Sequence, residues 1–78
     1  MPAVPSSLPV TIRLAERSDH RLLTRLAQLD SAALPPGPHL VAIREGRIDA
    51  ALSLPTGVLL ADPFRPTADL CELLERSA

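Results

Sequence analysis

The sequence predicts an α/β domain of the α+β type, in which a four-stranded, mostly antiparallel sheet with strand order 1-2-3-4 carries one helix on each face. Three observations predict this fold. Apolar residues alternate with period two in some stretches and recur at helical spacing in two others. A two-residue connection, Glu45-Gly46, joins two apolar runs. Turns containing Pro or Gly separate the remaining runs, which gives the order β-α-β-β-β-α.

The composition limits the class of protein. The 78 residues suffice for one small domain, which buries only about 60% of the surface that its unfolded chain exposes. The eight basic residues are all arginines, spread along a chain of net charge −1, so no basic stripe offers itself to nucleic acid. No apolar run reaches the roughly 18 residues of a membrane span, and the N-terminus lacks the pattern of a signal peptide. We therefore expect a cytoplasmic protein with no nucleic-acid or membrane partner.

The chain begins with a predicted flexible lead-in at residues 1–8, which contains Pro and Ser. A single domain is predicted for residues 9–78. Its first strand runs from Pro9 to Ala15, where β-branched residues follow a proline that costs no ladder hydrogen bond. Period-two alternation places the apolar side chains of this strand on one face, namely Val10, Ile12 and Leu14.

The period changes from Glu16 to Leu29, which predicts the first helix. The apolar residues recur at helical spacing: Leu22, Leu23, Leu26, Ala27 and Leu29. Ser18 or Asp19 can cap its start. Three prolines between residues 30 and 38 end the helix, after room for a short helical turn at residues 31–34.

The second and third strands are predicted at Leu40–Arg44 and Arg47–Leu54, on either side of the hairpin turn. A further turn at residues 55–57 leads to Val58–Ala61, which is apolar at four successive positions. Such a run is typical of a strand that is covered on both faces. We therefore expect this fourth strand to contribute to the core from both sides.

The last helix is predicted to begin near Pro66, which suits a first helical turn. Thr67 and Asp69 suit the capping, acidic end of a helix. The apolar stripe that follows consists of Leu70, Cys71, Leu73 and Leu74. Because Cys71 falls on this stripe and is the only cysteine, we expect a buried, inert thiol and no intramolecular disulfide.

The order of elements and several short phrases resemble the N-terminal half of the GCN5-related N-acetyltransferases (the GNAT family). The phrases are Thr11-Ile12-Arg13 with Ala15 and Asp19, Leu29-Asp30, Leu40-Val41-Ala42, Glu45-Gly46, Ala50-Ala51-Leu52-Ser53-Leu54 and Leu60-Ala61-Asp62-Pro63. The resemblance covers Val10 to about Glu75. It implies a half GNAT fold, with acetyl-CoA as the cofactor of the family.

The resemblance also implies where acetyl-CoA would bind. The family holds the cofactor's pyrophosphate in an Arg/Gln-x-x-Gly-x-Gly/Ala loop at a helix N-terminus, and this position corresponds to Arg65, Thr67 and Ala68. The loop departs from the pattern, because Ala68 and Leu70 replace the glycines and Pro66 lacks an N–H. The family's later strand and tyrosine general acid also have no counterpart here, since the sequence contains no Tyr.

The two histidines are candidate site residues. His39 precedes a strand after a proline-rich turn, and a surface or turn histidine is the favoured interpretation because no ligand set surrounds it. His20 lies in the first turn of the first helix, where solvent exposure is favoured. The sequence therefore predicts no metal ligands.

Charged residues near the turns have structural interpretations as well. Glu16 and Asp19 are explained by the helix dipole better than by acid–base chemistry. Arg44 and Arg47 flank the hairpin turn and could bind an anion, but beside Glu45 and Asp49 the favoured interpretation is a solvated rim. No catalytic residue is predicted.

Three hypotheses for function follow. The leading one is a GNAT-related small domain without acetyl transfer of its own, acting as a binding or assembly module. The alternative is an acetyl-CoA-dependent N-acetyltransferase completed by a second chain or copy, and the third is a fragment without a selected activity. An apolar fourth strand at a sheet edge favours a homodimer or a partner chain at that edge, over residues 58–62.

Overall fold

The computed structural model describes residues 9–78, and the predicted lead-in lies outside these described residues. The elements in chain order are β1 (Val10–Leu14), the 3₁₀ turn η1 (Arg17–Asp19), α1 (His20–Leu29), β2 (His39–Arg44), β3 (Arg47–Ser53), β4 (Leu59–Ala61) and α2 (Ala68–Ser77). Each strand pairs antiparallel with the next, in the order β1-β2-β3-β4. The predicted sheet and its strand order are therefore confirmed.

The hairpin between β2 and β3 has the predicted two-residue turn. Glu45 and Gly46 have φ values of 55° and 74°, and Arg44 pairs with Arg47 across them. Positive φ at both central residues is the turn that matches the right-handed twist of two paired strands. Glycine at the second position adopts this conformation without strain.

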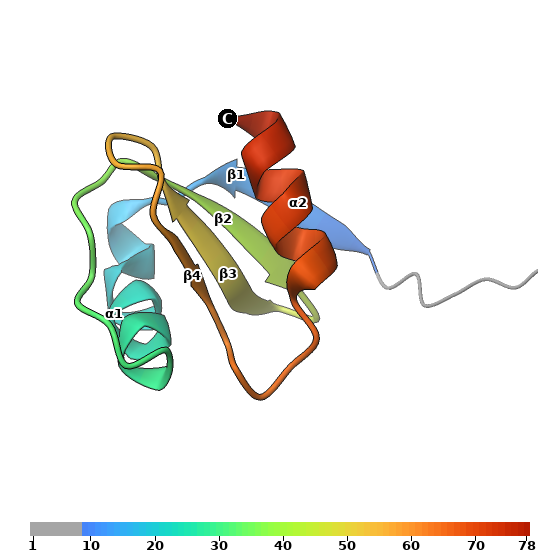
Figure 1. The fold of residues 1–78 in the computed structure, drawn as a ribbon, viewed down its shortest axis with the longest axis horizontal. Helices are drawn as coiled ribbons and strands as arrows, with labels where there is room; N and C mark the ends of the chain where they lie inside the picture. Colours follow the sequence, from blue (N-terminus) through green and yellow to red (C-terminus); the bar gives the residue numbers. More distant parts are fainter. Residues whose placement is uncertain (1–8) are drawn as a thin grey trace, which may run out of the picture.

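The two helices cover opposite faces of the sheet, as predicted (Figure 1). On the α1 face, the buried apolar residues are Leu23, Leu26, Ala27, Val41, Ala51 and Leu60. On the α2 face, they are Ala42, Ala50, Leu52, Leu70 and Leu74, with Leu59 and Ala61 packed against them. The fourth strand thus contributes Leu60 to one face and its two neighbours to the other, as its apolar run predicted.

The first strand differs from its prediction at one end. Val10 and Ile12 pack against the α2 cluster, but Leu14 is 56% exposed. The α2 cluster does not extend as far as Leu14. Period-two alternation therefore predicts which face Leu14 is on, but it does not predict that the residue is exposed. A strand pattern reports which side a residue faces and does not report how far the covering helix extends.

The start of α1 is organised by Asp19, which is buried. Its carboxylate accepts the backbone N–H of Glu16 at 2.7 Å and two hydrogen bonds from Arg13, at 2.7 and 3.2 Å. It makes no side-chain hydrogen bond to the N–H groups of α1 itself. Asp19 therefore does not cap α1. Its side chain instead connects the 3₁₀ turn to β1.

The helical turn allowed for residues 31–34 does not form. Ser31 has φ of 53°, its N–H bonds to the carbonyl of Gln28 at 3.1 Å, and the N–H of Ala32 bonds to Ala27 at 2.9 Å. This pair of bonds is the usual left-handed termination of a helix, with serine in the place that glycine commonly takes. The chain leaves the helix axis there, so no further turn follows.

The proline-rich loop after α1 is fastened to the sheet. The His39 ring lies 2.8 Å from the Pro35 carbonyl through Nε2, and the Ser53 hydroxyl donates to the Pro36 carbonyl at 2.6 Å. The backbone N–H of Leu54 donates to the Pro38 carbonyl at 3.0 Å. His39 is 8% exposed, so the interpretation of a surface histidine is wrong, because a loop carbonyl supplies the partner that burial requires.

Candidate functional site

Two arginines, Arg44 and Arg65, converge on Asp49 in β3. Ala42 of β2 pairs with Ala50 and Ile43 pairs with Ile48, so Asp49 is the extra residue of a β-bulge. Its side chain is 2% exposed, and one oxygen, Oδ2, accepts hydrogen bonds from two arginines. A bulge therefore places a carboxylate under the start of α2, between the apolar residues Ile48 and Ala50 of the strand.

Arg44 is the first of these arginines. Its Nε lies 3.3 Å from Asp49 Oδ2, and its Nη2 donates to the carbonyl of Pro66 at 2.6 Å. Its Nη1 lies 3.8 Å from Asp69 on α2. The residue is 8% exposed, which corrects the interpretation of Arg44 as part of a solvated rim, whereas Arg47 is exposed as expected.

Arg65 is the second. Its Nε donates to Asp49 Oδ2 at 2.9 Å, and its Nη2 donates to Glu45 Oε1 at 2.9 Å. The hydrogen bond from Arg65 holds the pKa of the Glu45 carboxyl below its ordinary value. Reciprocally, Glu45 first and Asp49 second raise the pKa of Arg65. Arg65 thus connects the hairpin turn, the bulge and the loop before α2.

The three residues predicted to hold acetyl-CoA lie together at the start of α2. Arg65 is in the preceding loop, Thr67 is the N-cap residue, and Ala68 is the first helical residue. Thr67 makes no side-chain capping bond, although its carbonyl accepts the N–H of Cys71 at 3.0 Å. Pro66 precedes the N-cap, so the prediction that it lies in the first helical turn is wrong, and its carbonyl accepts a hydrogen bond from Arg44.

The charge around this helix start is unfavourable for a phosphate. Arg44 and Arg65 are accompanied within salt-bridge distance by three carboxylates, those of Glu45, Asp49 and Asp69. The carboxylates therefore exceed the arginines by one. Both guanidinium groups are already engaged, so an incoming diphosphate would compete with internal carboxylates for them. Two features would favour phosphate binding here, namely the helix dipole and the remaining N–H donors of Arg65.

The outer edge of β4 is a second candidate surface. The N–H of Ser53 bonds to the Val58 carbonyl and the N–H of Asp62 bonds to the Asp49 carbonyl, at 2.9 and 3.0 Å. In an antiparallel ladder alternate residues face the partner, so the backbone groups of Leu59 and Ala61 point away from β3. Within residues 9–78, the group that bonds to this edge is Asp30, which accepts the Ala61 N–H at 3.3 Å.

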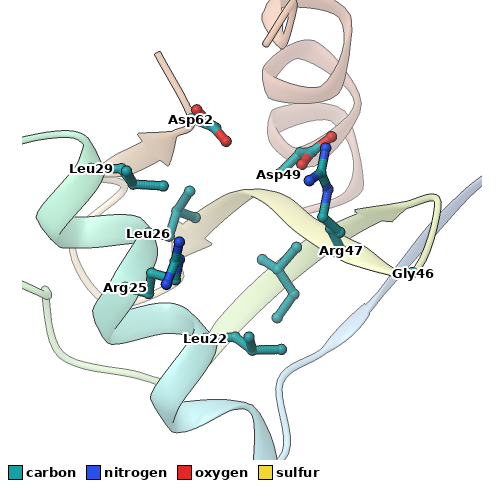
Figure 2. Close-up of a pocket in the computed structure, with 9 residues that line it drawn as sticks. Leu22, Arg25, Leu26, Leu29, Gly46, Arg47, Asp49 and Asp62 are labelled. Atoms are coloured by element: carbon teal, nitrogen blue, oxygen red, sulfur yellow. The ribbon is translucent and has the colours of Figure 1, made fainter. Parts of the chain in front are cut away.

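A cavity of about 180 Å³ lies on the other face of the sheet, between α1 and the β2–β3 hairpin (Figure 2). Apolar side chains from α1 and β3 line it, including Leu22, Leu26, Leu29 and Ile48. Arg25, Arg47 and Asp62 also border it, and the Arg47 side chain extends toward Asp49 and α2 (Figure 2). The cavity is separate from the three predicted cofactor residues.

The structure also shows where the remaining candidate residues, His20 and Cys71, lie. His20 is exposed, and Cys71 is half-buried on α2, where burial is the main cause that raises the pKa of its thiol. No three His, Cys, Asp or Glu side chains gather as a metal site among residues 9–78. In the same range, neither helix has the length and hydropathy that crossing a bilayer requires.

The buried role of Asp49 was missed in the sequence. Its neighbours offered one signal, since a lone charge stands between Ile48 and a run of three apolar residues, 50–52. A charge at such a position is rare in a strand interior unless a partner neutralises it. One partner, Arg44, lies across the hairpin turn, but the other, Arg65, is 16 residues away, and the bulge that turns the Asp49 side chain toward them has no local signature.

Comparison with known proteins gives no relative for this chain: no family model, no curated protein and no solved structure matches it.

Proposed function

We propose that this chain is a GNAT-related small domain that acts as an assembly or binding module and does not transfer acetyl groups by itself. The observation that carries the proposal is the outer edge of β4, where the Leu59 N–H and the carbonyls of Leu59 and Ala61 point away from the sheet. Backbone groups at such an edge pair readily with a further strand. Cytoplasmic location belongs to the same proposal.

The occupant of this edge is a second copy of the chain. Val58 and Phe64 border β4 on its two sides and are 45% and 80% exposed. Two antiparallel copies of β4 would bring these apolar side chains against each other around a two-fold axis. Little on this edge opposes pairing with another strand: the chain has no lysine, and among residues 9–78 Asp30 covers a single N–H of the edge, that of Ala61.

Sedimentation equilibrium at micromolar concentration tests the assembly. We expect a species of twice the 8.3 kDa chain mass, and Val58→Lys should return it to the monomer mass, because a charged side chain would be buried in the contact. Leu14→Lys is the matched control, since Leu14 is also exposed but lies on β1 at the other edge. A wild-type chain that sediments only as 8.3 kDa would contradict the proposal.

The alternative is an acetyl-CoA-dependent N-acetyltransferase completed by a second chain or copy. The placement of Arg65, Thr67 and Ala68 at the start of α2, directly after β4, favours it. A strand added at the β4 edge would stand beside that helix start. The alternative therefore uses the same edge as the assembly proposal.

Calorimetric titration with CoA and acetyl-CoA separates the two. Because carboxylates already engage both arginines, we expect binding by the chain alone to be no tighter than about millimolar. Arg65→Ala should then leave the titration unchanged. Saturable binding at micromolar concentration that Arg65→Ala abolishes would favour the acetyltransferase.

A further inference from the structure

We propose that the exposed face of α1 binds the exposed face of α2 on a second copy of the chain, with Leu73 of that copy seated in the cavity beside α1. This contact is separate from the β4 edge and goes beyond the assembly proposed above. The two helices cover opposite faces of the sheet, so their outer surfaces point away from each other (Figure 1). One copy therefore presents both surfaces at once, and copies can stack face to face.

The outer surface of α1 is basic. The helix contains two arginines, Arg21 and Arg25, and no acidic residue, and both arginines are exposed. Arg17, four residues before Arg21, is exposed as well. In the described chain the five ion pairs involve other arginines, so these three are open to a partner.

The acidic residues near α1 do not cancel this charge. Asp19 is paired with an arginine of β1, and Asp30 faces β4, where it accepts a backbone N–H. Glu16 and Asp62 remain, one before the 3₁₀ turn and the other beside the cavity. The three exposed arginines against these two carboxylates leave the outer surface of α1 with a positive excess.

The outer surface of α2 is acidic. Its exposed acids are Asp69, Glu72 and Glu75, against one arginine, Arg76. Asp69 lies 3.8 Å from an arginine of β2, so Glu72 and Glu75 carry the charge that is open to a partner. Leu73 lies between them in the sequence and is 37% exposed. Carboxylates around an exposed leucine complement a basic surface that has an apolar hollow.

The cavity between α1 and the hairpin supplies the hollow. It measures about 180 Å³, and its apolar lining is formed by Leu22, Leu26, Leu29 and Ile48 (Figure 2). A dry cavity of about 150 Å³ accommodates benzene, so this one accommodates a leucine side chain. Leu22 is 45% exposed, and seating Leu73 beside it removes both leucines from water. Arg21 and Arg25, on either side of Leu22 in the sequence, then face the carboxylates that flank Leu73.

The contact is heterologous, because its two surfaces differ and lie on opposite faces of the domain. Each added copy leaves one surface of each kind free, so association continues beyond two copies. One helix against another buries less than the roughly 1,200 Å² at which specific, stable interfaces begin. The association is therefore weak and forms only at high protein concentration.

Sedimentation of the Val58→Lys chain from micromolar to millimolar concentration tests this contact apart from the β4 edge. We expect the average mass to rise steadily above 8.3 kDa in low salt and to fall back in about 1 M salt, where charges are screened beyond about 3 Å. Amide shifts should change with concentration at Leu22, Arg25 and Leu73 and stay constant at Thr11 on β1. A constant mass of 8.3 kDa at millimolar concentration in low salt would overturn the proposal and leave the β4-edge proposal standing.

Charge reversal identifies the two surfaces. One variant carries Arg21→Glu with Arg25→Glu and the other carries Glu72→Arg with Glu75→Arg, both in the Val58→Lys chain. Each should weaken self-association at least about tenfold, because like charges then face each other. An equimolar mixture of the two should restore association, since every surface again meets its complement. All four positions are exposed, and amide spectra report whether each variant folds.

Leu73→Ser in both reversed chains separates a seated contact from general attraction between chains of opposite net charge. Because the leucine fills the cavity, the mixture without it should associate at least about tenfold more weakly. Equal association of the mixtures with and without Leu73 would assign the effect to net charge and overturn the proposal.

Discussion

Each helix of this domain is fastened to the sheet at its N-terminal end by arginine and aspartate, but the two attachments differ in kind. At α1, Arg13 of β1 holds Asp19, six residues further along the chain, and the two side chains are 36% and 8% exposed. At α2, Arg44 and Arg65 hold Asp49, and the three side chains are 10%, 22% and 2% exposed. One attachment is local and partly solvated, and the other is buried and joins distant segments.

The difference shows where the fold is vulnerable. An ion pair that water reaches contributes little, because water competes for both charges. A buried pair contributes uncertain net stability when intact, but removal of one partner leaves a charge that nothing compensates. The attachment of α2 should therefore be far more sensitive to substitution than that of α1.

Asp49→Asn should have the largest effect. The substitution keeps the volume of the side chain and leaves Arg44 and Arg65 without their shared counter-charge. We expect the free energy of unfolding to fall by about 3–5 kcal/mol, as measured by urea denaturation. Glu72→Gln on the exposed side of α2 is the control, with an expected change within about 0.5 kcal/mol. If both variants unfold at similar urea concentrations, the buried attachment of α2 is not especially sensitive to substitution, and the two attachments do not differ as proposed.

Truncation of the apolar core should cost slightly less, and should cost the same on both faces. Leu60 belongs to the α1 cluster and Leu70 to the α2 cluster, and each is at most 1% exposed. Replacing either by alanine should lower the free energy of unfolding by about 2–5 kcal/mol. Leu73→Ala, at a position 37% exposed on α2, should cost clearly less. If Leu60→Ala and Leu70→Ala differ greatly in their effect on the free energy of unfolding, the two faces of the sheet differ in apolar packing and not only in their ion pairs.

Asp19→Asn tests the local attachment. Asp19 accepts two hydrogen bonds from Arg13 and one from the Glu16 backbone, and an amide oxygen can keep only part of this set. We expect a loss of about 1–3 kcal/mol by the same denaturation measurement. Asp69→Asn is the matched control, because its side chain is 66% exposed and lies 3.8 Å from Arg44. If Asp19→Asn costs as much as Asp49→Asn, burial does not govern these attachments.

Lowering the pH should have the smallest effect on the stability of the domain. Hydrogen bonds from Arg13 and then from the Glu16 backbone lower the pKa of Asp19 below its usual 3.8, and the hydrogen bond from Arg65 lowers that of Glu45 below its usual 4.5. The unfolded chain therefore takes up protons at higher pH than the folded chain does. The stability from these two groups is fully present above about pH 5 and is lost as the pH falls through the lowered values.

Denaturation midpoints measured between pH 7 and pH 2 check this dependence. The wild-type midpoint should decline below about pH 4, and Asp19→Asn combined with Glu45→Gln should flatten that decline. A decline that persists unchanged in the double variant would assign the acid sensitivity to other carboxylates.

Local chemistry was sufficient to predict most of the backbone. The helical spacing of the leucines in α1, the positive-φ preference of Gly46 and the apolar run of β4 each act over a few residues, and each prediction of an element was confirmed. The ends of elements were less certain, since Ser31 terminates α1 in a conformation that glycine usually adopts. The placement of Arg65, Thr67 and Ala68 around the start of α2 also followed from the sequence.

The sequence by itself determined the order of the elements, the strand order and the apolar faces, because periodicity and turn chemistry are properties of neighbouring residues. Only the tertiary structure decided which polar residues are buried. His39, Arg44 and Asp49 read as surface residues along the chain, yet each is buried against a group 4 to 22 residues away. A charge is buried only where its partner arrives, and that depends on the bulge at Asp49 and the docking of α2, which no local pattern encodes.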